Sequence, residues 1–148
     1  MASTEPAVIR SLATDDDLAP APLDPTWIVD GDPRPRSRAL AVDRNRTISA
    51  TLWDCTTGRF NWHYGGDEIV EILAGEAELT FPTGVVTTIR AGDMIYFPGA
   101  QIVQWHVPTY LRKVTHYSSH TSLPRRLALR IPFARRVVQM LRARSLMA

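Results

Sequence analysis

Turn residues divide most of the chain into short segments of strand-forming residues, and this rhythm limits the folds open to it. From residue 39 onward, segments rich in β-branched and aromatic residues recur about every ten residues, separated by turns that contain glycine, proline or aspartate. The segments expected to form strands are residues 39–42, 47–54, 60–64, 67–73, 76–81, 85–89, 94–97, 102–107 and 112–117. Many short strands with such turns predict an all-β sandwich or a small barrel.

The size and composition of the chain fit one domain. It has 148 residues, of which 45% are apolar, enough to bury a core of its own. No apolar run of about 18 residues occurs, and no basic start is followed by an apolar block. We therefore expect neither a membrane span nor a secretory signal, and predict a cytoplasmic protein. Cys55 is the only cysteine, which excludes an internal disulfide and a cysteine-rich zinc site and favours a small core residue.

The two ends of the chain differ in character from its middle. Residues 1–22 combine prolines with an acidic run and are predicted to be a flexible arm. Residues 23–120 hold the strand-like segments and are predicted to be the barrel domain. Residues 121–148 are predicted to be a basic, amphipathic helical tail, because apolar residues recur there at three- and four-residue steps beside several arginines.

Charge is distributed unevenly along the chain. Residues 1–93 carry eight arginines and fifteen acidic residues, a balance of −7, whereas residues 94–148 carry eight arginines, one lysine and no acidic residue, a balance of +9. We expect the basic tail to dock on the acidic body or on a partner subunit, with contact to a membrane surface as the less favoured alternative. The strands show no interleaving of aromatic and basic residues, so no nucleic-acid partner is expected.

Residues 53–75 concentrate aromatic, titratable and glycine residues and form the candidate site. Because side chains alternate along a strand, Asn61 and His63 lie on the same face, and Glu68 follows after the turn of a predicted hairpin. An imidazole and a carboxylate that meet inside a barrel could bind a divalent first-row metal. Without a metal, the same pair could act as an acid and a base.

A structural interpretation of these residues stays open beside the chemical one. His63 could be a hydrogen-bonded core histidine, and Glu68 a buried acid whose charge is compensated by Arg59 or Lys113. Either cation could instead clamp an anionic group of a ligand, as could Arg46. The candidate aromatic walls of a ligand site are Trp53, Tyr64 and Trp105, together with Trp62 and Tyr96.

The spacing in this stretch resembles the first sequence motif of the cupin superfamily. Asn61-x-His63, a four-residue gap, Glu68, six further residues and Gly75 follow in the order of that motif, with asparagine in place of its first histidine. The second motif is similar to Gly92, five residues, Pro98-Gly99-Ala100, two residues and then Val103, where the family has its fourth ligand.

Within the superfamily, the chain is most similar to the branch of ethanolamine-utilisation and ureidoglycine aminohydrolase-like proteins. The resemblance covers roughly residues 23–118. The residues that carry it are Trp53, Cys55, Gly58, Arg59, Phe60, Trp62, Tyr64, Asp67, Glu68, Ile72, Leu73, Gly75, Glu76, Gly92, Asp93, Phe97, Pro98, Trp105, Val107, Arg112 and Lys113.

The resemblance implies a single jelly-roll barrel, also called a double-stranded β-helix, with a site in its interior. It implies a divalent metal held by His63, Glu68, Asn61 and Gln101, the last lying two residues before Val103 in the same strand phase. Zinc, manganese, iron and nickel are not distinguished, and affinity should be lower than with four intact ligands. A homodimer is also implied, for which Trp27-Ile28-Val29 is the candidate exchanged edge segment.

Three functions from different classes follow. The first is a small-molecule enzyme of hydrolase, lyase or isomerase type, acting on a small polar metabolite inside the barrel with His63 and Glu68 as metal ligands or as an acid–base pair. The second is a cupin that binds a small ligand without catalysis. The third is an accessory protein that recruits a partner or a membrane through its basic C-terminal helix.

Overall fold

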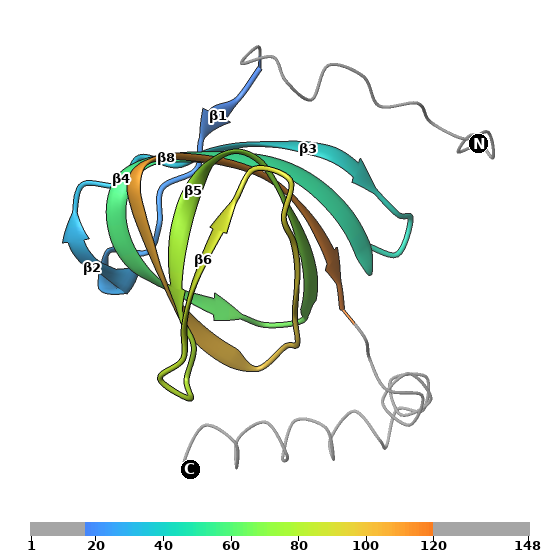
Figure 1. Ribbon diagram of the computed structural model, residues 1–148. Helices are drawn as coiled ribbons and strands as arrows, with labels where there is room; N and C mark the ends of the chain where they lie inside the picture. Colours follow the sequence, from blue (N-terminus) through green and yellow to red (C-terminus); the bar gives the residue numbers. More distant parts are fainter. Residues whose placement is uncertain (1–16, 120–148) are drawn as a thin grey trace.

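The computed structural model describes residues 17–119, which form an antiparallel sheet curled into a barrel (Figure 1). Its elements are β1 (Ala19–Pro20), the 3-10 helix η1 (Pro25–Trp27), β2 (Ile28–Gly31), β3 (Arg36–Val42), β4 (Ile48–Tyr64), β5 (Asp67–Thr80), β6 (Val86–Arg90), β7 (Met94–Phe97) and β8 (Gln101–Ser118). The predicted all-β fold is confirmed.

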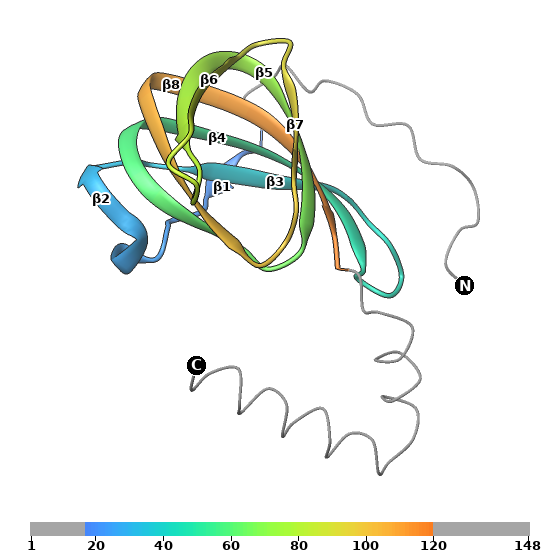
Figure 2. The ribbon, with the colours of Figure 1, turned by 60° about the horizontal axis from the view of Figure 1, so that its bottom comes forward.

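Strand β8 joins the two halves of the barrel. It pairs along its length with β4 on one side and with β5 on the other, within the order β1-β3-β4-β8-β5-β6. Strand β2 adds to β4, and β7 adds to β5. Figure 1 shows the three long strands curving around one interior, and the turned view in Figure 2 shows β2 beside β4, outside that ring.

Each long strand contains two of the short strands expected from the sequence. Residues 47–54 and 60–64 merge into β4, and the segments predicted within residues 67–81 and 102–117 merge into β5 and β8. Bulges bend these strands without ending their ladders, between Thr56 and Gly58 and again around residues 72–78. The turn-forming residues in the sequence therefore mark bends within strands as well as turns between strands.

Gly75 shows why a bend within a strand can have the same sequence pattern as a turn. Its φ is +77°, and a Cβ atom there would lie 1.9 Å from the carbonyl oxygen of Tyr110 on the neighbouring strand. Only glycine fits this conformation and this close approach. Gly75 thus lies inside β5, at a bulge, and not at a turn between the two strands predicted at residues 67–73 and 76–81.

The hairpin predicted around residues 64–67 is wrong in its pairing. β4 ends at Tyr64 and β5 begins at Asp67, so the turn itself lies where expected. However, both strands pair with β8 at opposite ends: Tyr64 faces Gln101, whereas Asp67 faces Ser118. Such non-local pairing is not visible in a local pattern of turn residues.

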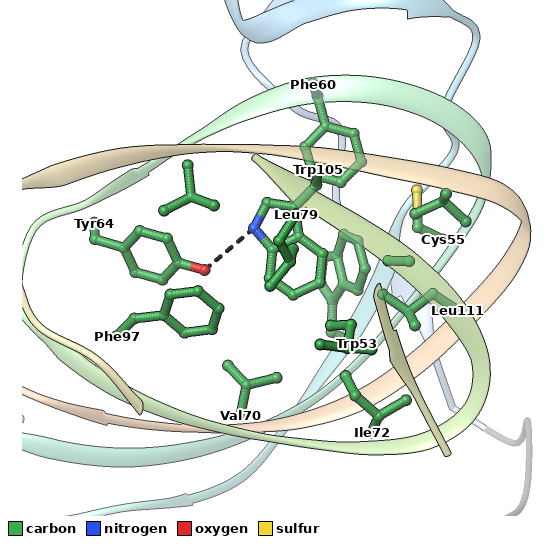
Figure 3. Packing of buried hydrophobic residues seen from close by; sticks show 14 residues of the cluster. Trp53, Cys55, Phe60, Tyr64, Val70, Ile72, Leu79, Phe97, Trp105 and Leu111 are labelled. Atoms are coloured by element: carbon green, nitrogen blue, oxygen red, sulfur yellow. Dashed lines mark hydrogen bonds between the residues drawn. The ribbon is translucent and has the colours of Figure 1, made fainter. Parts of the chain in front are cut away.

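Aromatic side chains fill much of the barrel (Figure 3). The Tyr64 and Phe97 rings stack with centroids 4.6 Å apart, and Trp105 Nε1 donates a 3.2 Å hydrogen bond to the Tyr64 hydroxyl. Cys55 is 1% exposed within the same cluster, as expected for a small core residue.

The structure can be compared with the predictions made for the N-terminal arm, for the edge segment at residues 27–29 and for membrane spans. β1 pairs with β3, so residues 19–20 of the predicted arm belong to the sheet, while residues 1–16 and the predicted tail at 121–148 lie outside the described residues. Trp27 belongs to η1, and Ile28 to Gly31 pair with β4 of the same chain. Within residues 17–119, no helix is long and apolar enough to cross a membrane.

Candidate functional site

The alternation of side chains along β4 decides which of its residues face the interior. Phe60 and Tyr64 are buried in the aromatic core, and Trp62 packs against it. Asn61 and His63, the residues between them, therefore point to the outer face of the sheet. Bulky aromatic rings bury more apolar area than an asparagine or a histidine, so they occupy the inner face.

The predicted meeting of His63 and Glu68 is wrong. His63 is exposed, and its ring stacks on Trp27 with centroids 4.5 Å apart and planes 7° from parallel. Glu68 is only 7% exposed and lines a partly open pocket, the cavity described below. The two residues lie on opposite faces of the sheet and are not paired with each other in this structure.

Inside the barrel, Lys113 rather than the predicted His63 lies near Glu68. It is 2% exposed, and it lies opposite Trp53 of β4 and Ile72 of β5. Its Nζ atom lies 4.8, 4.9 and 4.6 Å from the ring centroids of Trp53, Trp62 and Trp105. Three electron-rich ring faces around one ammonium group stabilise its charge in a site with little access to water.

Glu68 is the acidic partner of Lys113 across this interior. Burial raises the pKa of the Glu68 carboxyl, while the Lys113 charge and a hydrogen bond from the Trp62 side chain lower it. Burial lowers the pKa of Lys113 to about 8, and Glu68 opposes that shift. Within the described residues, the Oε2 atom of Glu68 is buried without a hydrogen-bond partner, and no ion pair joins it to Lys113.

Both charged groups lie on the wall of one cavity of about 390 Å³. This volume falls within the range of small-molecule sites, roughly 300 to 1,000 Å³. The lining residues are Ala21, Pro22, Leu23, Asp24, Trp27, Ser37, Thr51, Trp53, Trp62, Glu68, Lys113, Thr115 and Tyr117. A largely apolar wall with two opposite charges can hold a small polar molecule and exchange protons with it.

The other residues predicted as metal donors do not reach this cavity. Asn61 accepts a 3.4 Å hydrogen bond from Gln104 on the outer face, and Gln101 donates one of 2.7 Å to the carbonyl of Pro98. Across residues 17–119, no three or more His, Cys, Asp or Glu side chains are close enough together to hold a metal ion. The donors present therefore do not fit the divalent metal that the resemblance implies, and we derive no chemistry from one.

The residues predicted to bind substrate separate into two groups. Trp53 and Lys113 line the cavity, and Trp105 lies beneath Lys113. Tyr64 belongs to the packed core, and Arg59 lies on the outer face, where it donates a 3.3 Å hydrogen bond to Gln104. Arg59 is therefore not placed to clamp an anion inside the barrel.

Sequence reasoning missed several residues that line the cavity. Thr115 and Tyr117 share the inner face of β8 with Lys113, because they lie two and four residues further along the strand. Strand alternation counted from Lys113 could have found them. The segment from Ala21 to Asp24 was assigned partly to a flexible arm, and no local pattern indicates that it lies against the barrel.

A sequence model of the EutQ-like cupin domain matches residues 42–115, which is half of the chain. The chain belongs to the EutQ-like cupins. The match includes the strands that carry Trp53, Glu68 and Lys113 and excludes the segment at residues 21–24. No curated protein matches the chain.

Solved structures agree with this cupin at the level of the fold. A putative ethanolamine utilization protein EutQ from Salmonella typhimurium is 21% identical, with a TM-score of 0.52 over 57% of this chain and 69% of that one. EutQ from Clostridium difficile is 16% identical, with a TM-score of 0.53 over 69% and 83%. A protein of unknown function from Pseudomonas syringae is 24% identical, with a TM-score of 0.63 over 68% and 44%.

Proposed function

We propose that this cupin binds a small polar molecule in the partly open cavity lined by Glu68 and Lys113 and acts on it by proton transfer through these two residues. The observation that carries the proposal is the placement of a buried carboxylate and a buried amine on one cavity wall. A buried acceptor left without a partner costs about 1–3 kcal/mol. A donor group on a ligand would remove that cost at the Oε2 atom of Glu68.

The electrostatics of the pair support acid–base chemistry near neutral pH. Burial raises the pKa of Glu68 and lowers that of Lys113 to about 8, which moves both groups toward the pH at which a protein acid or base is most effective. Hydrolases, lyases and isomerases of small metabolites all use such transfers. Lys113 replaces His63 as the partner of Glu68 in this function.

Ligand binding without catalysis is the second candidate function. The aromatic part of the cavity wall favours it, since Trp27, Trp53 and Trp62 offer ring faces for stacking and little chemistry of their own. The same charged groups would then orient the ligand. Turnover of a bound compound, followed by NMR, separates this function from catalysis.

Intrinsic fluorescence provides a direct test, because all four tryptophans of the chain lie at this site. Three of them line the cavity, and the fourth, Trp105, contacts Lys113. A panel of short carboxylic acids, amines and carbonyl compounds should contain ligands that change this fluorescence saturably. Lys113→Met and Glu68→Gln should weaken that binding by about tenfold or more, the loss of one buried polar contact.

The matched control is Arg59→Gln, which removes a cation from the outer face of the same strand. It should leave ligand affinity unchanged. A ligand that binds the wild type and both cavity variants equally well, or that depends on Arg59 instead, would reject the proposed site.

A further inference from the structure

Lys113 is the only lysine in the chain, which otherwise carries sixteen arginines and four histidines. This single primary amine on a side chain is also 2% exposed, inside the barrel. Lysines mostly lie on protein surfaces, where the ammonium group is hydrated. A fully buried lysine on the wall of a ligand-sized cavity needs an explanation beyond solubility or a surface ion pair.

The surroundings of the Nζ atom leave it open to a reaction partner. Within residues 17–119, no hydrogen bond or ion pair holds it, and its close neighbours are the ring faces of three tryptophans. Glu68 lies on the same cavity wall with one carboxylate oxygen unpartnered. The cavity thus contains an amine and a proton carrier, and its volume of about 390 Å³ fits a small molecule.

We propose that Lys113 is a nucleophile that forms an imine with a small aldehyde or ketone bound in this cavity. The inference rests on the proposed function, since the cavity must first admit a ligand. It deepens that function by naming the substrate class and the atom that bonds to it.

The reaction balances without any added oxidant or reductant. The Nζ lone pair attacks the carbonyl carbon, and the displaced electron pair of the C=O bond takes a proton to become a hydroxyl group. Loss of that hydroxyl as water, with a second proton supplied, leaves a C=N bond. Overall, one ammonium and one carbonyl compound give one protonated imine and one water, and Glu68 is placed to carry the protons between nitrogen and oxygen.

Two features of the site favour this product. The rings that stabilise the ammonium form of Lys113 also stabilise the protonated imine, because both carry a positive charge at the same nitrogen. The lowered pKa of Lys113, about 8, leaves about one amine in ten neutral at pH 7, far more than for an exposed lysine.

Borohydride trapping tests the proposal on the full chain. Protein is incubated with propionaldehyde or with pyruvate, sodium cyanoborohydride is added, and the adduct is located by peptide mass spectrometry. The expected result is a reduced adduct on Lys113 that forms at least tenfold faster than on an ordinary lysine and more slowly in Glu68→Gln. Saturation of the trapping rate with probe concentration should match the fluorescence titration of the same probe.

The matched control moves the amine to the surface. The double variant Lys113→Met with Arg90→Lys keeps one lysine, now at an exposed position of β6. Trapping at Lys113 no faster than at residue 90 of this variant would overturn the inference. Saturable binding of either probe without an adduct would overturn the imine while leaving the proposed function intact, and absence of binding by any compound of the wider panel would reject both. Thermal unfolding of each variant confirms that it is folded before the rates are compared.

Discussion

The phenol of Tyr110 donates a 2.9 Å hydrogen bond to the carboxylate of Asp54, which is 1% exposed and also forms an ion pair with Arg36. Two donors on different elements thus converge on one buried acid of β4. Asp54→Ala should lower the free energy of unfolding by about 2–3 kcal/mol, because the Tyr110 hydroxyl and the Arg36 guanidinium both lose their acceptor.

Urea denaturation measures this change, and Asp32→Ala is its control. Asp32 also pairs with an arginine, Arg34, but both side chains are more than three-quarters exposed. Its loss should cost less than about 1 kcal/mol, as for other surface pairs. Equal costs at the two positions would contradict the structural role assigned to Asp54.

Gly75→Ala is predicted to be one of the most damaging small substitutions in the barrel. The added Cβ would lie 1.9 Å from the Tyr110 carbonyl oxygen, in a backbone with a φ of +77°. We expect a loss of about 3 kcal/mol or more, the range typical of backbone strain combined with a steric clash. Gly84→Ala shares the positive φ but meets no atom within 4 Å, so it should cost only about 1 kcal/mol. Thermal or urea unfolding of both variants would show whether the close contact, rather than the φ angle, dominates.

The lowered pKa of Lys113 predicts how stability depends on alkaline pH. Between about 8 and the ordinary value of 10.5, the unfolded chain holds a proton that the folded chain has released, so the free energy of unfolding contributed by this residue rises with pH. Wild type should therefore gain stability relative to Lys113→Met as the pH is raised from 7.5 to 9.5.

Comparison of the two proteins cancels the contributions of ionisable groups that do not interact with Lys113. The groups that act on its charge are Glu68 and Cys55. Burial raises the pKa of Cys55 to about 12 and also raises that of Tyr64, so neither ionises in this range. A difference in stability that stays constant or falls with rising pH would contradict the buried position of the amine.

The separation of His63 and Glu68 predicts the outcome of a metal test. Protein purified without a metal-binding tag is titrated with zinc or manganese while its melting temperature is followed. His63→Ala should leave any metal-dependent shift unchanged, because the exposed ring stacks on Trp27 and does not face the cavity. Tight stoichiometric metal binding that is lost in both His63→Ala and Glu68→Ala would show that the two residues act together after all.

The sequence predicted the class of fold, the strand segments and part of the site. Trp53, Glu68 and Lys113 were among the candidates, and all three line the cavity. His63 was misplaced because alternation shows which residues share a face and not which face is inside. The aromatic residues at 60, 62 and 64 determine which face of β4 lies inside. Burying their rings is more favourable in free energy than burying the polar residues between them.

The partners of each strand could not be predicted in the same way. Turn residues between β4 and β5 indicate a change of direction, but the choice of β8 as common neighbour depends on closing a sheet over long distances in sequence. The place of residues 21–24 against the cavity likewise depends on tertiary contacts. Local patterns thus identify the elements and the candidate chemistry, while the assembled sheet decides which side chains meet.

Because β8 pairs with both β4 and β5, the barrel cannot be completed during synthesis until β8 has been made. A chain that grows from its N-terminus makes β4 and β5 long before the strand that binds them both. Until residue 118 has left the ribosome, the edges of those two strands have no common neighbour to join them, and Lys113 has not yet reached its tryptophans. The cavity is therefore completed only after β8 has been synthesised, well after the other two long strands.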